Sequence, residues 1–351
     1  MMYLKKLVTI FVFSFMIISC SDDDKKVEEK GDYADGFFIT NEGPFNNGSG
    51  SITHVSEEGV ITQKVYEKVN NEVLGNIVQS MSMHNDKAYI VVNNSNKVVV
   101  VDRYTLKKMG TIEGEGVHFP RHMVAFNDRG YLSNWGDPIN NSDDFISVID
   151  LNKDEVIEVI PVGEGPENMA ISQGKLFINL EGGYSQNKFV MALNLNNLES
   201  VEMIEVADVP NSILKDDKDH IWVLCGGKPA WTGSETNGSL YRIDPSDLSQ
   251  EHIGFTTSQH PDLLTFTNGN LFLNLDGKVL KINANSIEAP IEIVQGIEGY
   301  FYSMNAFNGN LYVTDAKDYQ SEGELKIFSA STGAELETLM TGVIPGSVVF
   351  Q

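Results

Sequence analysis

Several polar residues in this sequence directly follow a proline, in segments that recur along the chain. Their types include both charges and an amide, which are the groups that orient a ligand with polar edges. If the fold brings these segments to one opening, we expect the side chains to bind a small molecule there; the alternative is that they only solvate the opening. The residues after the prolines are Arg121, Glu167, Asn211, Asp262 and Gly346, and Gln79 and Tyr302 hold the matching positions in two segments without proline.

Large aromatic side chains occupy polar stretches between the apolar runs. Two of the three tryptophans, Trp135 and Trp231, lie in such stretches, and so do Tyr184 and Tyr319. Aromatic rings outside strands are unusual unless they cover something, such as the flat face of a ligand. We therefore expect a stacking role for these four rings; the alternative is that they pack over neighbouring parts of the fold.

Local motifs for catalysis or metal binding are missing from the sequence. His118 and His122 are four residues apart, but the intervening Pro120 prevents them from sharing one helical face. No Gly-x-Ser-x-Gly elbow is present. Cys225 is the one cysteine after Cys20, so it has no partner for a disulfide or a multi-cysteine metal site. We predict no catalytic residue, no cofactor and no bound metal.

The elements that must position these residues repeat seven times. Each repeat has an apolar strand with an aromatic residue at a fixed place, preceded by a strand and a tight polar turn and followed by two more strands. The steps between the aromatics are about 45 residues, the length of a four-stranded propeller blade. The aromatics are Phe38, Tyr89, Tyr131, Phe177, Trp222, Phe272 and Tyr312.

The order of strands predicts how the ring closes. If the strands of each repeat are named A to D, the chain starts at strand B of the first blade and ends on a strand A, residues 347–350. We therefore predict an all-β fold, a seven-bladed β-propeller over residues 36–351, closed by the C-terminal strand joining the N-terminal blade. Because strand directions alternate, the B–C and D–A loops share one face, called here the loop face, which carries the candidate residues above.

The N-terminal segment has the features of an export signal. Lys5 and Lys6 precede an apolar run that is short for a membrane span, and a polar stretch follows at once. We predict a signal peptide over residues 1–19 and a charged tether over residues 20–35, which has too little apolar surface to fold. The run that ends in Ser19-Cys20 resembles the lipobox of bacterial lipoproteins, which implies lipid attachment at Cys20; an ordinary signal peptide is the alternative.

The net charge excludes several classes of partner. The chain carries a formal charge of −24 at pH 7. Binding to nucleic acid or to an anionic membrane surface requires a basic face, which this composition does not provide. We predict no nucleic-acid partner, and contact with a membrane only through the lipid on Cys20.

The repeats resemble those of the YVTN-type propellers, in which an aromatic strand is followed by a polar loop and a strand that ends in Asp, as in residues 89–102. With its N-terminal segment, the whole chain resembles the surface propeller lipoproteins of Bacteroidetes. That group includes the cobalamin-capturing lipoproteins that sit over a TonB-dependent outer-membrane transporter. The acidic stretch after Cys20 is similar to their surface-export signal. The resemblance implies an outer-membrane, lipid-anchored protein that faces the cell exterior.

The leading hypothesis from the resemblance is capture of a bulky small molecule, with cobalamin or a related corrinoid favoured, and its transfer to a TonB-dependent transporter. The four loop aromatics would stack on the apolar faces of the ligand. The polar ligand-binding residues would be Arg121, Asn134, Glu167, Asn211, Asp262 and Tyr302.

Two alternatives remain open on the sequence. The aromatic loops would instead meet a partner chain if the protein is an interaction scaffold at the cell surface. The chain also resembles the sugar-lactone hydrolases built on the same ring, which hold a divalent metal with Glu, Asn and Asp. Glu167, Asn211 and Asp262 would supply such ligands in a metal-dependent, lactonase-like hydrolase. We expect a binding protein and not an enzyme.

Overall fold

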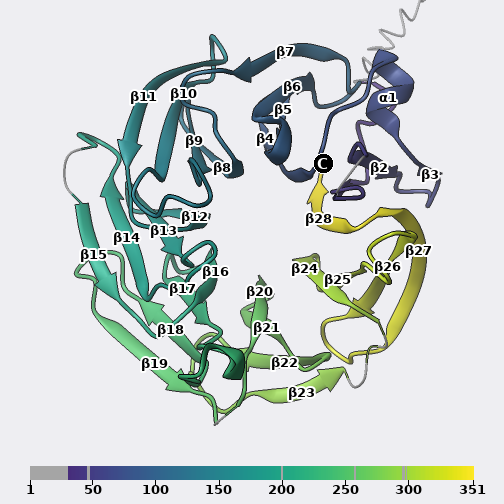
Figure 1. Ribbon diagram of the computed structural model, residues 1–351. Coiled ribbons are helices and arrows are strands. Elements are labelled where there is room, and N and C mark those ends of the chain that lie inside the picture. Colours follow the sequence, from purple (N-terminus) through teal and green to yellow (C-terminus); the bar gives the residue numbers. More distant parts are fainter. Residues whose placement is uncertain (1–30, 46–47, 199–200, 257, 295–296, 298) are drawn as a thin grey trace, which may run out of the picture.

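The chain forms seven four-stranded antiparallel sheets arranged in a ring around a central shaft (Figure 1). This computed structural model describes residues 31–351 except 46–47, 199–200, 257, 295–296 and 298. The predicted signal peptide, the lipid anchor Cys20 and the tether up to residue 30 lie outside the described residues. The seven-bladed β-propeller predicted from the repeats is confirmed.

Blades one to four follow the predicted order of strands. Their bounds are β1 (Phe37–Asn41), β2 (Ser51–Val55) and β3 (Ile61–Thr62); β4 (Val78–His84), β5 (Lys87–Val92), β6 (Lys97–Asp102) and β7 (Lys108–Glu113); β8 (Pro120–Phe126), β9 (Arg129–Asn134), β10 (Phe145–Asp150) and β11 (Glu155–Pro161); β12 (Pro166–Ser172), β13 (Lys175–Leu180), β14 (Phe189–Asn194) and β15 (Val201–Glu205).

Blades five to seven and the closing strand complete the ring. Their bounds are β16 (Pro210–Lys215), β17 (Ile221–Cys225), β18 (Ser239–Ile243) and β19 (Gln250–Gly254); β20 (Asp262–Thr267), β21 (Asn270–Leu275), β22 (Lys278–Asn283) and β23 (Ile291–Val294); β24 (Phe301–Phe307), β25 (Asn310–Asp315), β26 (Glu322–Ser329) and β27 (Glu335–Val343); and β28 (Pro345–Phe350).

The predicted closure of the ring is confirmed. Strand β28 pairs antiparallel with β1, so that Phe37 lies opposite Phe350 and Ile39 opposite Val348. The ring of Phe350 also stacks on that of Phe307 in blade seven, with centroids 4.2 Å apart. The last strand therefore joins blades seven and one, and the inner edge of the first blade is not left unpaired.

The core lies between the blades. Each blade is apolar on both faces and packs against its neighbours, and the seven repeated aromatics on the B strands are all buried. The inner A strands contact one another in sequence around the shaft, from β4 to β28. Because neighbouring blades pack tightly against one another, the angle of each blade is fixed, and so are the positions of its loops at the shaft.

Blade one has features that the repeats did not predict. Strand β3 is only two residues long, and a short helix α1 (Val65–Asn70) follows it. Val65 and Tyr66 of this helix are buried in the core cluster of Phe38 and so take over the packing that a longer outer strand provides in other blades. Among the described residues, no helix is long and apolar enough to cross a membrane.

The described end of the tether, residues 31–35, lies against the propeller. The backbone N–H of Tyr33 donates to the carbonyl of Tyr104 at 2.9 Å, and its own carbonyl accepts from Gln351 Nε2 at 2.5 Å. The His54 ring contacts the carbonyl of Asp35 at 2.8 Å. The chain is thus already fixed to blades one and two a few residues before β1.

Candidate functional site

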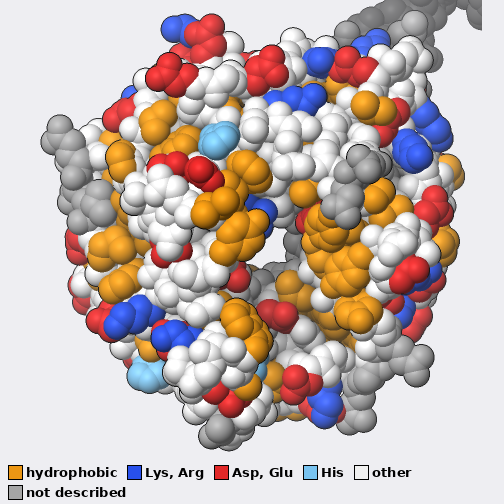
Figure 2. Space-filling model, in the orientation of Figure 1, with side chains coloured by type: hydrophobic (Ala, Val, Ile, Leu, Met, Phe, Trp, Pro, Cys, Tyr) orange, Lys and Arg blue, Asp and Glu red, His pale blue; other side chains and the backbone are white. Residues whose placement is uncertain are grey.

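The shaft contains a cavity of about 710 Å³ that opens at the centre of the ring (Figure 2). At the loop face it is lined by polar side chains from all seven blades. These residues are Glu42, Gln79, Arg121, Glu181, Asn211, Asp262 and Tyr302. The structure thus brings four of the predicted residues, Arg121, Asn211, Asp262 and Tyr302, together around one opening, and Glu167 contacts this group through Arg121.

A backbone irregularity at the start of each inner strand turns these side chains toward the shaft. A register shift lies at the beginning of the inner strand in all seven blades. Bulges of this kind bend a strand and redirect its side chains. In five blades the residue just before the inner strand has a positive φ, namely Ile77, Phe119, Gly165, Val209 and Ile344.

Each of these five residues with a positive φ makes the same type of backbone hydrogen bond. In each of these five blades, the carbonyl of that residue accepts from the backbone N–H of the residue just after strand B. Non-glycine residues such as Phe119, Val209 and Ile344 adopt this conformation at a cost of about 1–3 kcal/mol each. The pairing fixes both chain segments at the shaft, and the donors include Glu42, Trp135 and Glu181.

Arg121 is the centre of a closed polar network on one side of the shaft. Its Nε donates to both carboxylate oxygens of Glu167, at 3.0 and 3.1 Å, and its Nη1 donates to Gln79 Oε1 at 2.6 Å. The Trp135 ring covers the guanidinium, with 4.3 Å from Cζ to the centroid. This ion pair, with one N–H shared between both carboxylate oxygens and an indole over the guanidinium, holds the Arg121 side chain in one orientation.

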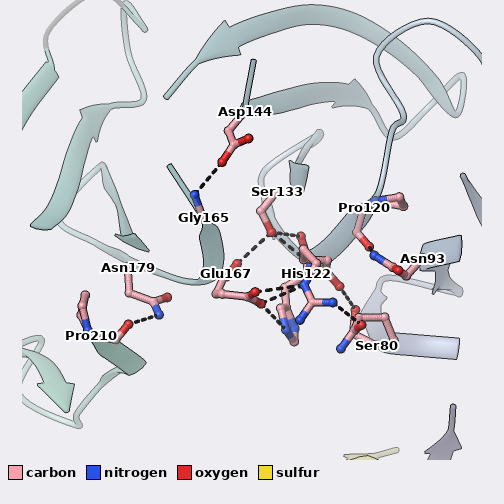
Figure 3. A network of polar contacts seen from close by, with 12 residues as sticks. Ser80, Asn93, Pro120, His122, Ser133, Asp144, Gly165, Glu167, Asn179 and Pro210 are labelled. Carbon is pink, nitrogen blue, oxygen red and sulfur yellow. Dashed lines mark hydrogen bonds and ion pairs between the residues drawn. The ribbon is translucent and has the colours of Figure 1, made fainter. Parts of the chain in front are cut away.

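Figure 3 shows Glu167 and His122 beside each other in this network, and burial shifts the pKa of both side chains. Glu167 is 5% exposed, and burial raises the pKa of its carboxyl while Arg121 opposes the rise. Burial lowers the pKa of His122 to about 3, and the nearby Arg121 adds to the effect. Ser133 Oγ donates to the Glu167 carbonyl at 2.8 Å. His122 is therefore neutral, and Arg121 is the cation that balances Glu167.

Three further carboxyl groups line the shaft without a cation of their own. Burial raises the pKa of Glu181 to about 8, with a further contribution from the charge of Glu167. Burial likewise raises the pKa of Asp262 to about 6, although Asn274 Nδ2 donates to it at 2.6 Å. Burial also raises the pKa of Glu42, and its hydrogen bond with Tyr302 opposes the rise. Glu181 and Asp262 therefore lose their protons closer to neutral pH than ordinary carboxyls do.

Two aromatic clusters lie at the shaft mouth, one at blades three and four and the other at blades seven and one. In the first, Trp135 and Tyr184 meet edge to face with centroids 5.8 Å apart. In the second, Tyr319 contacts Tyr302 at 5.9 Å, with Phe45 and Tyr300 beside it. Figure 2 shows apolar side chains on both sides of the opening. The clusters therefore face each other across the cavity.

Two predicted residues lie apart from this arrangement. Asn134 is fully buried, and its Nδ2 donates to the Leu132 carbonyl and to Ser147 Oγ, so its amide links the strands of blade three. Trp231 lies on the short helix η2 (Ala230–Thr232) and is 78% exposed. Among the described residues, no ring contact joins Trp231 to the two aromatic clusters.

The predicted residue Asn211 takes part in a link between blades that recurs elsewhere in the ring. Asn211 Nδ2 donates to the Pro261 carbonyl of the next blade at 2.9 Å, and Asn179 makes the same bond to Pro210 at 2.6 Å (Figure 3). Asn93 donates to Pro120 in the same way at 2.9 Å. The Oδ1 of Asn211 still faces the cavity side of β16, where it accepts from Ser212 Oγ at 3.1 Å.

Glu42 and Glu181 were not among the predicted site residues, because the polar ring at the shaft was sought in the D–A loops. Both lie directly after a B strand, at the position that Trp135 holds in blade three. Aligning the ends of the B strands across the repeats would have found them. The two carboxyls would then have appeared as members of the same ring as Asp262.

The residues of the hydrolase alternative already have partners within the protein. Within residues 31–351, apart from the gaps given above, no three His, Cys, Asp or Glu side chains are grouped closely enough to hold a metal ion. Glu167 is engaged by Arg121, Asn211 by Pro261 and Asp262 by Asn274. A metal ion on Glu167, Asn211 and Asp262 would have to displace these partners.

Fold and site together define a class of protein, a seven-bladed β-propeller with an acidic shaft under an aromatic mouth. The chain belongs to the family described as a domain of unknown function, DUF5074, whose model matches residues 35–272. No curated protein matches the chain in sequence.

Solved structures share the fold at low sequence identity. The chain is similar to the hydrazine synthase of Kuenenia stuttgartiensis, with a TM-score of 0.62 and 13% identity over 80% of this chain and 90% of that chain. It is also similar to the extracellular domain of a putative one component system from B. thetaiotaomicron, with a TM-score of 0.64 and 14% identity over 86% of this chain and 40% of that chain. AztD from Citrobacter koseri has a TM-score of 0.51 and 10% identity, over 89% and 96%. At these identities the likeness concerns the fold alone.

Proposed function

We propose that this protein captures a bulky small molecule on the loop face, with cobalamin or a related corrinoid as the favoured ligand. It acts as a lipoprotein anchored through Cys20 in the outer membrane, faces the cell exterior and passes the ligand to a TonB-dependent transporter. The observation that carries the proposal is the pair of aromatic clusters that face each other across the polar cavity.

The geometry supports a ligand with flat apolar faces and polar edges. Trp135 and Tyr184 on one side, and Tyr302 and Tyr319 on the other, offer rings for stacking. The carboxyls of the shaft accept hydrogen bonds from amide N–H groups, of which a corrinoid has many at its edge. Because the blades and bulges fix these groups before binding, little ordering entropy is lost.

Binding rather than catalysis also agrees with how the shaft uses its charges. Arg121 and Glu167 neutralise each other, and His122 is buried and neutral, so these three groups supply no activated nucleophile beside a base. A metal ion on Glu167 and Asn211 would have to displace the bonds that these side chains make with Arg121 and Pro261. We therefore propose a capture protein and not an enzyme.

A thermal-shift measurement on the mature chain carrying Cys20→Ser tests the ligand. Ligand that binds only the folded state raises the melting temperature by mass action. We expect a rise with cobalamin or cobinamide that weakens in Tyr184→Ala and Trp135→Ala and persists in Trp231→Ala. A rise with divalent metal alone would favour the hydrolase alternative, and no rise with any corrinoid would favour a protein partner.

A labelling experiment tests the location. Radioactive palmitate supplied to growing cells should enter the wild-type protein and not the Cys20→Ala variant. Protease added outside intact cells should then remove the anchored protein. Protection from the protease would place the anchored protein on the periplasmic side and contradict the transfer from the cell exterior.

A further inference from the structure

The chain enters the propeller on the face opposite the mouth, called here the turn face because the A–B and C–D turns form it. Strand β1 runs antiparallel to β28, so that its first residue, Phe37, lies opposite Phe350 at the end of β28, and Asn41 lies opposite Pro345 at the start. The inner strands start at the loop face, so the residues that precede β1 lie at the other end of the shaft.

Residues 31–35, called here the strap, are tied to the closing strand and to blade two. Gln351, which follows β28, donates from Nε2 to the carbonyls of Tyr33 at 2.5 Å and of Arg103 at 2.9 Å. Its Oε1 accepts from Arg103 Nε at 2.9 Å. The backbone N–H of Tyr33 donates to the carbonyl of Tyr104 at 2.9 Å. The side chain of Gln351 therefore joins the strap, β28 and the turn between β6 and β7.

The strap is also fixed to blade one. His54 is 2% exposed, and its Nε2 contacts the carbonyl of Asp35 at 2.8 Å. The ring of Tyr33 meets that of His54 edge to face, with centroids 5.1 Å apart. The backbone N–H of Glu57, in the turn between β2 and β3, donates to Asp35 Oδ1 at 3.4 Å. All of these contacts lie on the turn face.

The length of chain before the strap limits which face can turn to the membrane. Ten residues, 21–30, separate Cys20 from Gly31, and ten residues span at most about 33–36 Å when fully extended. The inner strands have six or seven residues, so the blades are about 20–23 Å tall before the loops at the mouth are added. With Cys20 in the membrane, the mouth could turn to it only if the tether were drawn out along the wall of a blade. That extension costs conformational entropy at every residue, and the turn face does not require it.

We propose that the strap holds the turn face toward the membrane, so that the mouth opens to the medium while the strap is docked. The inference rests on the lipid anchor of the proposed function and adds a control over the same site. Detachment of residues 31–36 would lengthen the free chain by about 20 Å and allow the mouth to turn toward a transporter in the membrane. The docked strap therefore favours capture, and the detached strap favours transfer.

The burial of the strap agrees with a segment that opens before the blades do. Its residues are half-buried or exposed, whereas Phe38 and Ile39 of the adjoining β1 are fully buried. Its apolar contact with the core is the half-buried ring of Tyr33. Segments with little apolar burial open at a lower free energy than the fold as a whole, so the strap can detach while the ring stays closed.

Two single-cysteine variants of blade three measure the orientation on intact cells. Ile139→Cys lies on the loop face, where Ile139 is 88% exposed, and Lys153→Cys lies in the turn between β10 and β11, where the side chain is 67% exposed. Cys225 is fully buried and Cys20 carries the proposed lipid, so neither reacts. A maleimide coupled to a large polyethylene glycol should modify Ile139→Cys several-fold faster than Lys153→Cys. In the purified soluble chain, which carries Cys20→Ser, the two rates should be similar.

Two further changes test whether the strap causes this difference. Gln351→Ala removes the side chain that bonds the strap, and Gln250→Ala, at an exposed position of β19, is its control. Insertion of about ten Gly and Ser residues after Lys30 leaves the propeller unchanged and adds about 33–36 Å of reach. Gln351→Ala and the insertion should each bring the two labelling rates together, and Gln250→Ala should keep them apart. If Gln351→Ala does not fold, the insertion alone decides.

Equal labelling of the two cysteines in the anchored protein, or faster labelling of Lys153→Cys, would overturn the proposal, and so would a difference that survives the insertion. Palmitate incorporation in the same cells separates this inference from the proposed function. Incorporation with equal labelling removes the orientation and leaves an anchored capture protein. Absence of palmitate removes the anchor, and the orientation with it.

Discussion

Two neighbouring groups of residues at the shaft mouth treat charge in opposite ways. Around Arg121, Nε–H is shared between the two carboxylate oxygens of Glu167, Nη1 donates to Gln79, and the Trp135 ring covers the guanidinium plane. Glu181, in the same blade as Glu167, has no hydrogen bond from the described residues, and Asp262 has only the amide of Asn274. Glu167 therefore has an ion-pair partner, whereas the carboxyls of Glu181 and Asp262 have raised pKa values and no ion pair among the described residues.

This difference gives the two groups different roles. A paired and covered arginine has a fixed geometry, so it stabilises the shape of the mouth. Carboxyls without an ion pair lower the stability of the native state, since their ionised forms lose part of their hydration without gaining a partner.

Replacement of Arg121 should have the largest effect on stability. Arg121→Met leaves Glu167 buried without its cation and removes the ring stack on Trp135. We expect a loss of about 3–5 kcal/mol in the free energy of unfolding at pH 7, measured by chemical denaturation. Lys153→Met, which removes a cation that is 67% exposed in its side chain, should change it by less than about 0.5 kcal/mol. Equal losses in the two variants would show that Arg121 is not a structural centre.

A double variant tests the cause of the stability loss expected in Arg121→Met. If the loss in Arg121→Met arises from the uncompensated carboxylate, Glu167→Gln in the same chain should recover about 1–3 kcal/mol of it. The control is Glu167→Gln alone, which leaves Arg121 without its anion and should be destabilising by itself. Additive effects in the double variant would contradict a coupled pair and point to lost packing on Trp135 instead.

In the group without an ion pair, Glu181→Gln should stabilise the protein, in a way that depends on pH. The pKa of Glu181 rises from 4.5 to about 8 on folding, so the native state binds this proton more tightly than the unfolded chain does. Its contribution to stability is complete below about pH 4.5 and is lost as the pH rises to about 8.

The variant lacks this titration, so the two proteins should converge in stability near pH 4.5. At pH 8 the variant should be more stable on the order of 1 kcal/mol, as measured by denaturation at each pH. A difference that does not change with pH would refute the buried, protonated carboxyl. Glu155→Gln serves as the control, because it removes one exposed charge from β11 and changes the net charge by the same amount.

The fold could be predicted from the sequence because each blade is formed by one short, continuous segment of the chain. The buried aromatic of the B strand and the turn before it recur at nearly fixed spacing, and the unmatched strand at each end required pairing of β28 with β1. The helix α1 could not be predicted in this way, because it follows a shortened outer strand in one repeat only and so gives no periodic pattern in the sequence.

The site was predicted only in part, for a physical reason. The ring of residues after the prolines was found because strand direction alone places it at the shaft. Whether each side chain is free or engaged depends on contacts between blades, which no local pattern records. Asn134 therefore reads like a loop residue but lies buried within blade three, and the pairing of Arg121 with Glu167 could not be foreseen.

The smallest expected effect on stability concerns the exposed aromatics, and it tests whether the rings serve binding or packing. Tyr184 is 76% exposed and touches Trp135, while Trp231 is 78% exposed and lies away from the mouth. Either change to alanine should alter the free energy of unfolding by less than about 0.5 kcal/mol. Only Tyr184→Ala should weaken corrinoid binding, by about three- to tenfold, since one stacked ring contributes about 0.5–1.5 kcal/mol. If Trp231→Ala weakens binding as much, the ligand extends over blade five and the two clusters are only part of its contact surface.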